Sequence, residues 1–174
     1  MKSDRDLFEA YKQDVYKLCR YMTNNGADAE DICQEVFIKA FAQERKRVTE
    51  ERAWLLRIAA NLCRNHYNRK KRGAYKEIRS VYLTKPPMPE QPEDEVVRQE
   101  QSNEFAQLLE GLPVKLRTTL TLRYGNGLSL EEVAQILEIP LGTVKSRIHK
   151  GLALMRKKME SKESYNGKGE KCFD

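Results

Sequence analysis

Apolar residues recur at helical spacing along most of this chain, so its coarse pattern is helical throughout. The first clear stripe consists of Val15, Leu18, Cys19 and Met22, and the Asn-Asn-Gly run of residues 24–26 ends it as a loop signal. A wider core stripe follows, made of Ile32, Cys33, Val36, Phe37, Ala40 and Phe41. Acidic residues open this second helix, at the positive end of its dipole.

A third helix is predicted after the polar loop of residues 43–51. Its buried side is formed by Trp54, Leu55, Ile58 and Leu62. Residues 52–79 hold nine Lys or Arg residues and a single acid, Glu77. Asparagines and aromatics are interleaved with these bases, and amides can bond base edges while rings stack on unpaired bases. This segment therefore predicts contact with single-stranded nucleic acid, although a basic helix end is also ordinary in itself.

The character of the chain changes at residues 85–95, which hold four prolines and four acids. Proline removes backbone donors and fixes φ, so this stretch is predicted to be a flexible linker and no helix. Helical periodicity resumes with Phe105, Leu108, Leu109 and Leu112. The expected fold is all-α, with two small helical domains on either side of the linker.

The last helices have the pattern of a helix-turn-helix. Ser129 and Glu132 have the spacing of a capping box, and Pro140 stops the short helix that they begin. The inward face of the next helix is predicted to consist of Val144, Ile148, Leu152 and Met155. Lys145, Ser146, His149 and Lys150 then point mostly the other way, as in a recognition helix. Six basic residues and no acid lie between positions 145 and 158, which favours DNA over a merely solvated face.

Charge and composition agree with a nucleic-acid partner. The net charge is +6 with a pI of about 9.1, and charged residues make up 33% of the chain. The four cysteines show no ligand or disulfide spacing, so Cys19, Cys33 and Cys63 are predicted to be buried, and Cys172 lies in a polar tail. No catalytic motif, metal site or cofactor site is predicted. No membrane-spanning run or signal peptide is apparent, so a cytoplasmic protein is expected.

Three segments, in this order and spacing, resemble the extracytoplasmic-function (ECF) sigma factors of bacteria. Residues 28–41, DAEDICQEVFIKAF, are similar to that family's polymerase-binding helix. Residues 53–72, AWLLRIAANLCRNHYNRKKR, resemble the helix pair that melts and reads the minus-ten element. Residues 112–159 are similar to the domain that reads the minus-thirty-five element, and GTVKSRIHKG at 142–151 is the most specific piece.

The resemblance implies a domain division and a set of site residues. Residues 1–79 would form a region 2-like domain, 80–103 the linker, 104–161 a region 4-like helix-turn-helix domain and 162–174 a flexible tail. The residues expected to contact core polymerase are Asp31, Gln34, Glu35 and Lys39. Those expected at the minus-ten element are Asn61, Asn65, Tyr67, Arg69, Lys70, Lys71 and Arg72, with Asn61 near the pocket for a flipped base. Those expected at the minus-thirty-five element are Thr143, Lys145, Ser146, Arg147, His149 and Lys150.

The resemblance also implies partners and a role. The partners are promoter DNA, core RNA polymerase through the clamp helices of its largest subunit and its flap, and an anti-sigma factor, which is often membrane-bound, in a stress or envelope response. One departure is visible: residues 45–56 read RKRVTEERAWLL, without the glycine and aromatic often found there, so the loop before Ala53 is expected to differ in shape.

Two other classes of protein compete with this interpretation. An ordinary helix-turn-helix repressor would explain the C-terminal domain but would leave the first eighty residues without a purpose. A nuclease would need a cluster of carboxylates or histidines in the basic segment, and residues 52–79 hold only Glu77 and His66. A promoter-specificity subunit, which is not an enzyme, explains both halves of the chain.

Overall fold

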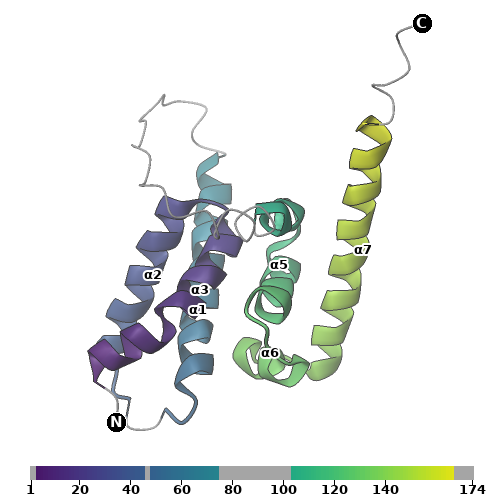
Figure 1. Cartoon of the computed structure of the whole chain (residues 1–174). Coiled ribbons are helices and arrows are strands. Elements are labelled where there is room, and N and C mark those ends of the chain that lie inside the picture. Colours follow the sequence, from purple (N-terminus) through teal and green to yellow (C-terminus); the bar gives the residue numbers. More distant parts are fainter. Residues whose placement is uncertain (1–2, 46–47, 75–102, 167–174) are drawn as a thin grey trace, which may run out of the picture.

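The structure, a computed structural model, describes residues 3–45, 48–74 and 103–166. Most of the predicted linker, residues 80–102, and Cys172 lie outside the described residues. Every regular element in the described part is a helix, so the all-α prediction is confirmed. The helices form two groups, one on each side of the linker (Figure 1).

The first group consists of α1 (Asp4–Thr23), α2 (Gly26–Phe41) and α3 (Glu51–Ala74). Ser3 and Asp6 form a capping box at the start of α1, and Asn25 caps α2 by accepting from the Asp28 N–H at 3.0 Å. Asn24 ends α1 in the left-handed conformation, at φ 51°. Residues 53–72, compared above to a helix pair, lie within the single helix α3.

Most of the predicted core stripe is buried, with two corrections. Ile32, Cys33, Val36, Phe37 and Ala40 are buried, but Phe41 is 37% exposed because α2 ends there and leaves one side of the ring to solvent. Trp54 and Ile58 only pack against the core from its edge. Leu56, Ala59 and Cys63 fill the interior of α3 beside Leu55 and Leu62.

The second group consists of α5 (Val114–Leu120), the π-helical turn η1 (Thr121–Gly125), α6 (Leu130–Leu137) and α7 (Leu141–Asn166), preceded by a helical segment at residues 103–109. The predicted capping box is confirmed, since Glu132 N–H donates to Ser129 Oγ at 3.1 Å and Ser129 N–H donates to Glu132 Oε2 at 2.7 Å. The helix ends before Pro140, as predicted, with Glu138 in the left-handed conformation at φ 54°. The helix-turn-helix is therefore present.

The inward face of α7 differs from the prediction at one position. Val144, Ile148 and Met155 are buried, but Leu152 is 38% exposed and Gly151 takes the inward place. A Cβ on Gly151 would lie 2.7 Å from Leu120 Cδ1, so α5 approaches α7 closely there. α7 also continues to Asn166, so the tail predicted from residue 162 begins as helix.

Replacing Gly151 with valine is expected to destabilise the protein by about 1–3 kcal/mol, because Leu120 is fully buried and has no free space to enter. Urea unfolding followed by circular dichroism measures this change. Gly142→Val is the matched control on the same helix, since a Cβ at Gly142 meets nothing within 4 Å. Equal unfolding midpoints for the two variants would show that the α5–α7 contact is not as close as the structure has it.

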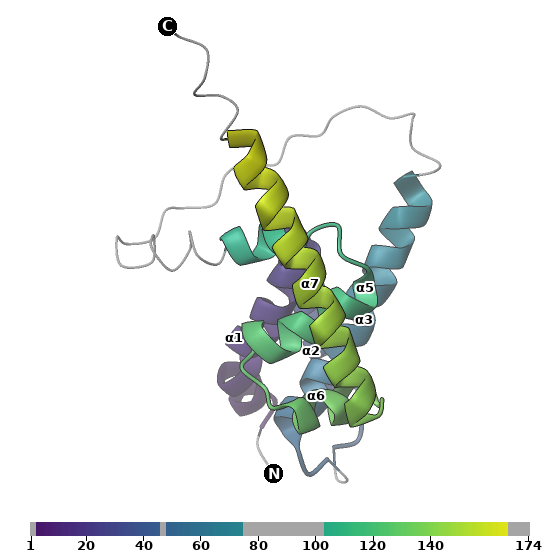
Figure 2. The ribbon, with the colours of Figure 1, turned by 90° about the vertical axis from the view of Figure 1, so that its right-hand side faces the viewer.

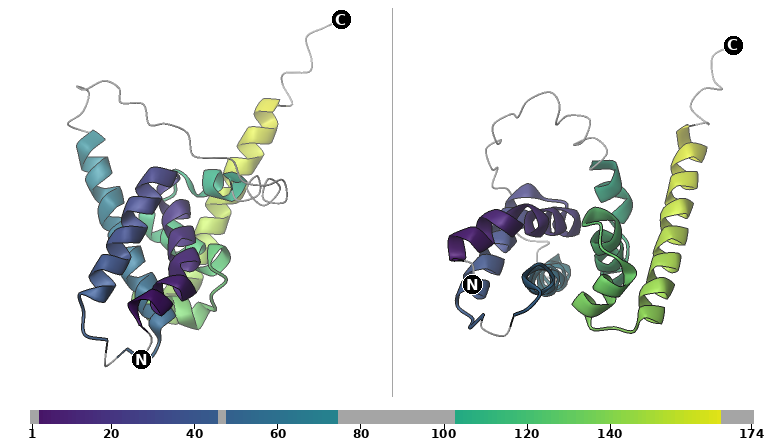
Figure 3. Two further views of the ribbon diagram at one scale, coloured as in Figure 1. Left: turned by 60° about the vertical axis from the view of Figure 1, so that its left-hand side comes forward. Right: turned by 60° about the horizontal axis from the view of Figure 1, so that its bottom comes forward.

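The two groups of helices pack against each other. α5, η1 and α6 lie between α1–α3 on one side and α7 on the other, and the three views agree on this layering (Figures 1, 2 and 3). Buried residues of both groups belong to one hydrophobic cluster, in which Leu18 and Leu56 are joined to Leu109, Leu122 and Val133. The sequence predicted two domains on a linker but did not predict this contact between them.

Candidate polymerase and promoter interfaces

The residues predicted to contact core polymerase share the outer face of α2. Asp31, Gln34 and Lys39 are exposed, and Glu35 is half-buried and lies 3.1 Å from the Lys39 ammonium group. This ion pair joins residues four apart on one helix, so it orients both side chains without burying them. The structure therefore brings all four predicted residues onto one accessible surface.

The sequence analysis missed apolar side chains on the same side of the molecule. Ile38 is 66% exposed and does not belong to the predicted core stripe of α2. Phe41 and Phe8 are each 37% exposed, and the Phe8 ring stands edge-on to Phe37 at 4.8 Å. A large exposed apolar residue among charged ones is the usual composition of a protein interface. The signal in the sequence that could have indicated this surface is Ile38, an apolar residue outside the core stripe of α2.

The predicted minus-ten residues divide between different faces of α3. Asn61, Asn65 and Arg72 are exposed and recur at helical spacing, so they lie on one side of the helix. Arg64 donates to the Asn61 side-chain oxygen at 2.9 Å and adds a cation that the prediction did not include. Lys71 is also exposed. This side combines amides and cations along about three turns of helix.

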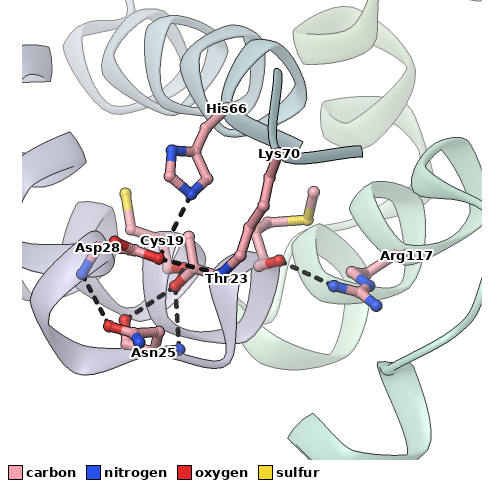
Figure 4. A network of polar contacts seen from close by, with 8 residues as sticks. Cys19, Thr23, Asn25, Asp28, His66, Lys70 and Arg117 are labelled. Atoms are coloured by element: carbon pink, nitrogen blue, oxygen red, sulfur yellow. Dashed lines mark hydrogen bonds and ion pairs between the residues drawn. The ribbon is translucent and has the colours of Figure 1, made fainter. Parts of the chain in front are cut away.

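Arg69 and Lys70 lie instead toward α2, beside a hollow of ≈ 490 Å³ that is also lined by Asp28, Asp31 and His66. The Lys70 ammonium and the His66 Nε2 each lie 3.4 Å from Asp28 Oδ2, and Figure 4 shows both side chains reaching from α3 toward this carboxylate. Part of the positive charge of α3 is therefore paired within the chain.

Tyr67 lies where α3 meets the second group of helices. The guanidinium of Arg117, on α5, stands 5.5 Å from the Tyr67 ring centroid. Tyr67 is half-buried, so its side chain is only partly open to solvent.

A second hollow, of ≈ 190 Å³, lies beside the loop that precedes α3. Val48, Thr49 and Trp54 line it, and Gln135 of α6 reaches it from the other domain. Asn61, predicted to lie near a pocket for a flipped base, lines a different cleft, described below. Trp54 was assigned to the core, so its exposed edge was not recognised as a pocket wall.

The predicted minus-thirty-five residues lie along the outer side of α7, with one exception. Lys145, Ser146, His149 and Lys150 are exposed, and Thr143 is half-buried at the start of the helix. Arg147 instead lines a narrow cleft of ≈ 90 Å³ between α3 and the helix-turn-helix, opposite Asn61. One residue predicted for the minus-thirty-five element and one predicted for the minus-ten element thus line the same cleft.

The cysteines are structural, as predicted for the three that the structure describes. Cys19, Cys33 and Cys63 are free thiols and are all buried. A hydrogen bond to Cys63, together with burial, raises the pKa of the Cys19 thiol far above its ordinary value. Burial raises the pKa of Cys33 to about 12. Neither group carries a thiolate at neutral pH, so neither is a ready nucleophile.

The described residues contain no cluster of three or more His, Cys, Asp or Glu side chains that could hold a metal ion. In the same part of the chain, no helix combines the length and apolar character needed to cross a bilayer. The predicted contact residues that are exposed lie on α2, α3 and α7.

The described chain thus combines one helical unit that carries an amide- and cation-bearing helix with a second unit that carries a helix-turn-helix. Residues 7–73 match the family model of sigma-70 region 2, and residues 102–155 match that of sigma-70 region 4. The chain belongs to the ECF RNA polymerase sigma factors. It is therefore a non-enzymatic specificity subunit, as predicted.

Similar proteins support this membership. The ECF RNA polymerase sigma factor SigW of Bacillus subtilis is 39% identical over 175 residues, which cover 91% of each chain. The sigma factor RpoE of Bartonella quintana, solved with the anti-sigma factor NepR, has the same fold, with a TM-score of 0.68 over 90% of this chain and 96% of that one at 19% identity. CnrH, solved with the cytosolic domain of CnrY, gives a TM-score of 0.64 over 91% of this chain and 88% of that one at 20% identity.

Proposed function

We propose that this chain binds core RNA polymerase and directs it to promoters with two separated recognition elements. The observation that carries the proposal is the match to both sigma regions together with an exposed reading face in each. In this proposal residues 1–79 form the polymerase-binding and minus-ten domain, 80–103 the linker, 104–161 the minus-thirty-five domain and 162–174 a tail. Action on polymerase and DNA places the protein in the cytoplasm.

The outer face of α2 is the proposed contact for the clamp helices of the polymerase's largest subunit. Asp31, Gln34, Glu35 and Lys39 supply polar groups, and Ile38 supplies apolar area at the centre of that face. Interfaces gain most of their affinity from a few desolvated central side chains, and the charged rim contributes orientation. Ile38 is therefore the proposed central contact, and the charged residues set the register of the two partners.

Gln34→Ala combined with Glu35→Ala is expected to weaken binding to core polymerase by about tenfold, since two polar interface contacts of about 0.5–1.5 kcal/mol each are lost. Titration of labelled protein with core polymerase measures the change. Gln13→Ala, at an exposed site on α1, is the control for labelling and folding. Core affinity equal to that of the unmodified chain would place the polymerase contact on another surface.

The exposed side of α3 is the proposed minus-ten surface. Asn61 and Asn65 can donate to and accept from base edges, while Arg72 and Lys71 hold phosphates. Tyr67 would stack on an unpaired base. Arg69 and Lys70 would act at the phosphates of the same strand, with Asp28 orienting Lys70. Opening the duplex costs unstacking energy, which these contacts offset in part.

The outer side of α7 is the proposed minus-thirty-five surface. Lys145, Ser146, His149 and Lys150 would face the major groove, with Thr143 and Arg147 at its edge, toward the phosphates. Lysine can donate either to guanine acceptors or to phosphates, so this face both positions the domain and reads sequence. The helix-turn-helix presents the first turns of α7 to the groove, which is where these residues lie.

The remaining contacts are also proposals. A hollow of ≈ 440 Å³ between residues 107–112 and α7 has leucine walls, from Leu108, Leu112 and Leu154, and a lysine rim. An amphipathic acidic segment fits such a hollow, and we assign the polymerase flap to it. One protein of the same fold was solved with an anti-sigma factor, and another with the cytosolic domain of CnrY. An anti-sigma factor, often membrane-bound in this family, is accordingly the proposed regulator in a stress or envelope response.

A further inference from the structure

The cleft of ≈ 90 Å³ between α3 and the second group of helices is lined mainly by basic side chains. Arg57 and Arg64 come from α3, Lys115 from α5 and Arg147 from α7. Glu138, which caps the end of α6, is the one acid among the described residues that line it. Four cations from three helices therefore meet around one narrow hollow, and a single carboxylate cannot balance their charge.

The one carboxylate of the cleft is already paired. Arg57 Nη1 lies 2.8 Å from Glu138 Oε1, and Arg57 Nη2 donates to the Gln135 carbonyl at 2.9 Å. The Glu138 side chain is 70% exposed, so solvent screens its charge. Glu138 therefore contributes little toward balancing the other three cations.

Those three cations have no acidic partner in the part of the chain that the structure describes. Arg64 donates at 2.9 Å to the side-chain oxygen of Asn61, which is neutral. No described carboxylate lies within ion-pair distance of Arg64, Lys115 or Arg147. Charges of one sign that converge on a cleft raise the local potential and attract an ion of the opposite sign. The cleft is therefore suited to an anion and repels a metal cation.

Apolar side chains strengthen this attraction. Ala60 and Ile136, which also line the cleft, are 5% and 2% exposed, and Leu137 is half-buried. Apolar walls exclude water and lower the local dielectric, so a charge held against them is screened less than on an open surface. An anion is therefore held more firmly here than by the same cations spread along an exposed helix.

The hydrogen-bond donors at the cleft belong to cationic side chains and one amide. Arg147 is half-buried and carries five N–H donors in a planar fork. The Asn61 oxygen accepts from Arg64, which leaves the amide nitrogen as a donor. Arg57 Nε–H is buried and finds no acceptor among the described residues. Buried donors are almost always paired, so a ligand that brings several oxygens to this cleft would relieve a costly group.

A phosphate group matches these donors in charge, shape and size. It carries a charge of about −1.5 to −2 at neutral pH and several strong acceptor oxygens. Arginine binds such oxygens through two parallel N–H bonds, and a carboxylate would bring less charge and fewer oxygens. The volume of ≈ 90 Å³ is the room of roughly three water molecules at ~30 Å³ each, which admits a phosphate group but no nucleoside.

We propose that this cleft is a binding site for one terminal phosphate group, either free inorganic phosphate or the end of a nucleotide whose base and sugar stay outside. A phosphodiester has a sugar on both sides and is too bulky to enter. The site takes Arg57 and Arg64 from the first group of helices and Lys115 and Arg147 from the second, so it is complete only where both groups meet. It goes beyond the proposed function, in which neither core polymerase nor promoter DNA fills this cleft.

Calorimetric titration of the full-length chain with inorganic phosphate, in a buffer free of phosphate, tests the site directly. We expect saturable binding of one phosphate per chain. Because a ligand that binds only the folded chain stabilises it, phosphate at about tenfold above its dissociation constant should raise Tm by about 3–6 °C. Sodium chloride added to the same ionic strength should give neither result. Absence of saturable binding, or an equal effect of chloride, would overturn the proposal.

Removing two cations of the cleft should weaken phosphate binding. Lys115→Gln combined with Arg147→Gln removes two charge-assisted hydrogen bonds, so we expect the affinity to fall by at least about tenfold. Arg5→Gln with Lys17→Gln is the matched control, since it removes two exposed cations of α1 outside the cleft. It should change the affinity by less than about twofold. Equal losses in the two double variants would show attraction by net charge alone and would rule out a site.

Glu138→Gln is expected to act in the opposite direction. It removes the one acid of the cleft and releases Arg57 Nη1, so phosphate should bind at least about threefold more tightly. Glu131→Gln makes the same change of charge at an exposed position of α6 that does not line the cleft, and should alter the affinity by less than about twofold. Circular dichroism verifies that each variant is folded. Unchanged or weaker binding in Glu138→Gln would contradict the proposed site.

Competition distinguishes the two sources of the phosphate group. A nucleoside triphosphate that binds more tightly than inorganic phosphate and displaces it identifies a nucleotide as the ligand, and one that binds no more tightly identifies free phosphate. A dinucleoside monophosphate, whose single phosphodiester lies between two sugars, should not displace phosphate even at about a hundredfold excess. Displacement by this compound at the concentration at which phosphate itself competes would overturn a terminal-phosphate site. None of these measurements involves transcription, so failure here is separate from failure of the proposed function.

Discussion

Lys145→Ala together with Lys150→Ala is expected to lower transcription from a promoter with an intact minus-thirty-five element by at least about thirtyfold. Both side chains are exposed on the outer side of α7, in its first turns, where a helix-turn-helix meets the major groove. Loss of one lysine contact to a guanine or a phosphate costs about 1–3 kcal/mol, so losing two costs at least about 2 kcal/mol. Multi-round transcription with core polymerase measures the loss.

The control for this prediction is a change of equal charge on another helix. Arg5→Ala with Lys17→Ala removes two exposed cations of α1, away from α7 and from the hollow beside it. We expect less than a threefold loss for that pair. Repeating the assay on a promoter whose upstream element is scrambled should remove the difference between the two double variants. If the Lys145 and Lys150 variant transcribes normally from the intact promoter, the reading face of α7 lies elsewhere.

Asn61→Ala combined with Tyr67→Ala is expected to reduce promoter opening by about ten- to a hundredfold. Stacking of one base on an aromatic side chain is worth about 1–3 kcal/mol, and the lost amide adds a base-edge contact. Reactivity of unpaired thymines toward permanganate, measured with the complete holoenzyme on duplex promoter DNA, reports the opened strand. Binding to core polymerase should not change, because the α2 face is separate.

Single variants show whether the ring or the hydroxyl group of Tyr67 contributes to promoter opening. Tyr67→Phe keeps the ring and should open the promoter nearly as well as the unmodified chain, whereas Tyr67→Ala should carry most of the defect. Tyr124→Ala serves as the control, since Tyr124 is a 51% exposed tyrosine on η1, outside the minus-ten surface. Normal thymine reactivity in the Asn61 and Tyr67 double variant would remove both residues from the melting surface.

Local features of the fold were predictable from the sequence because they depend on neighbouring residues. Ser129 and Glu132 form their capping box through groups three positions apart, and Pro140 follows the end of the helix for steric reasons. That Gly151, and not Leu152, faces inward on α7 was not predictable, because helical periodicity favours the apolar residue. Leu120 of α5 lies so close to α7 that only a glycine fits at the inward position, and this contact comes from another helix.

The contact between the domains could not be predicted for a related reason. Arg57 and Arg52 belong to a basic segment whose composition indicates nucleic acid, and nothing local shows that they bond Glu138 and Asn126. The sequence did not indicate that Arg117 is buried, because a buried guanidinium depends on carbonyl groups that only tertiary packing brings near it. Composition indicates nucleic acid as the partner of α3, but it could not show which side chains of α3 contact the second group of helices.

The account's central claim, that this chain is a promoter-specificity subunit with two reading surfaces, is tested most directly by mapping transcripts made after it is added to core RNA polymerase on genomic DNA. The account predicts new transcripts whose start sites share two upstream elements at a constant spacing. It also predicts that the free chain gives no specific protection of the same promoters. Absence of new start sites, together with tight and specific binding to duplex DNA without polymerase, would contradict the claim and identify an ordinary helix-turn-helix regulator.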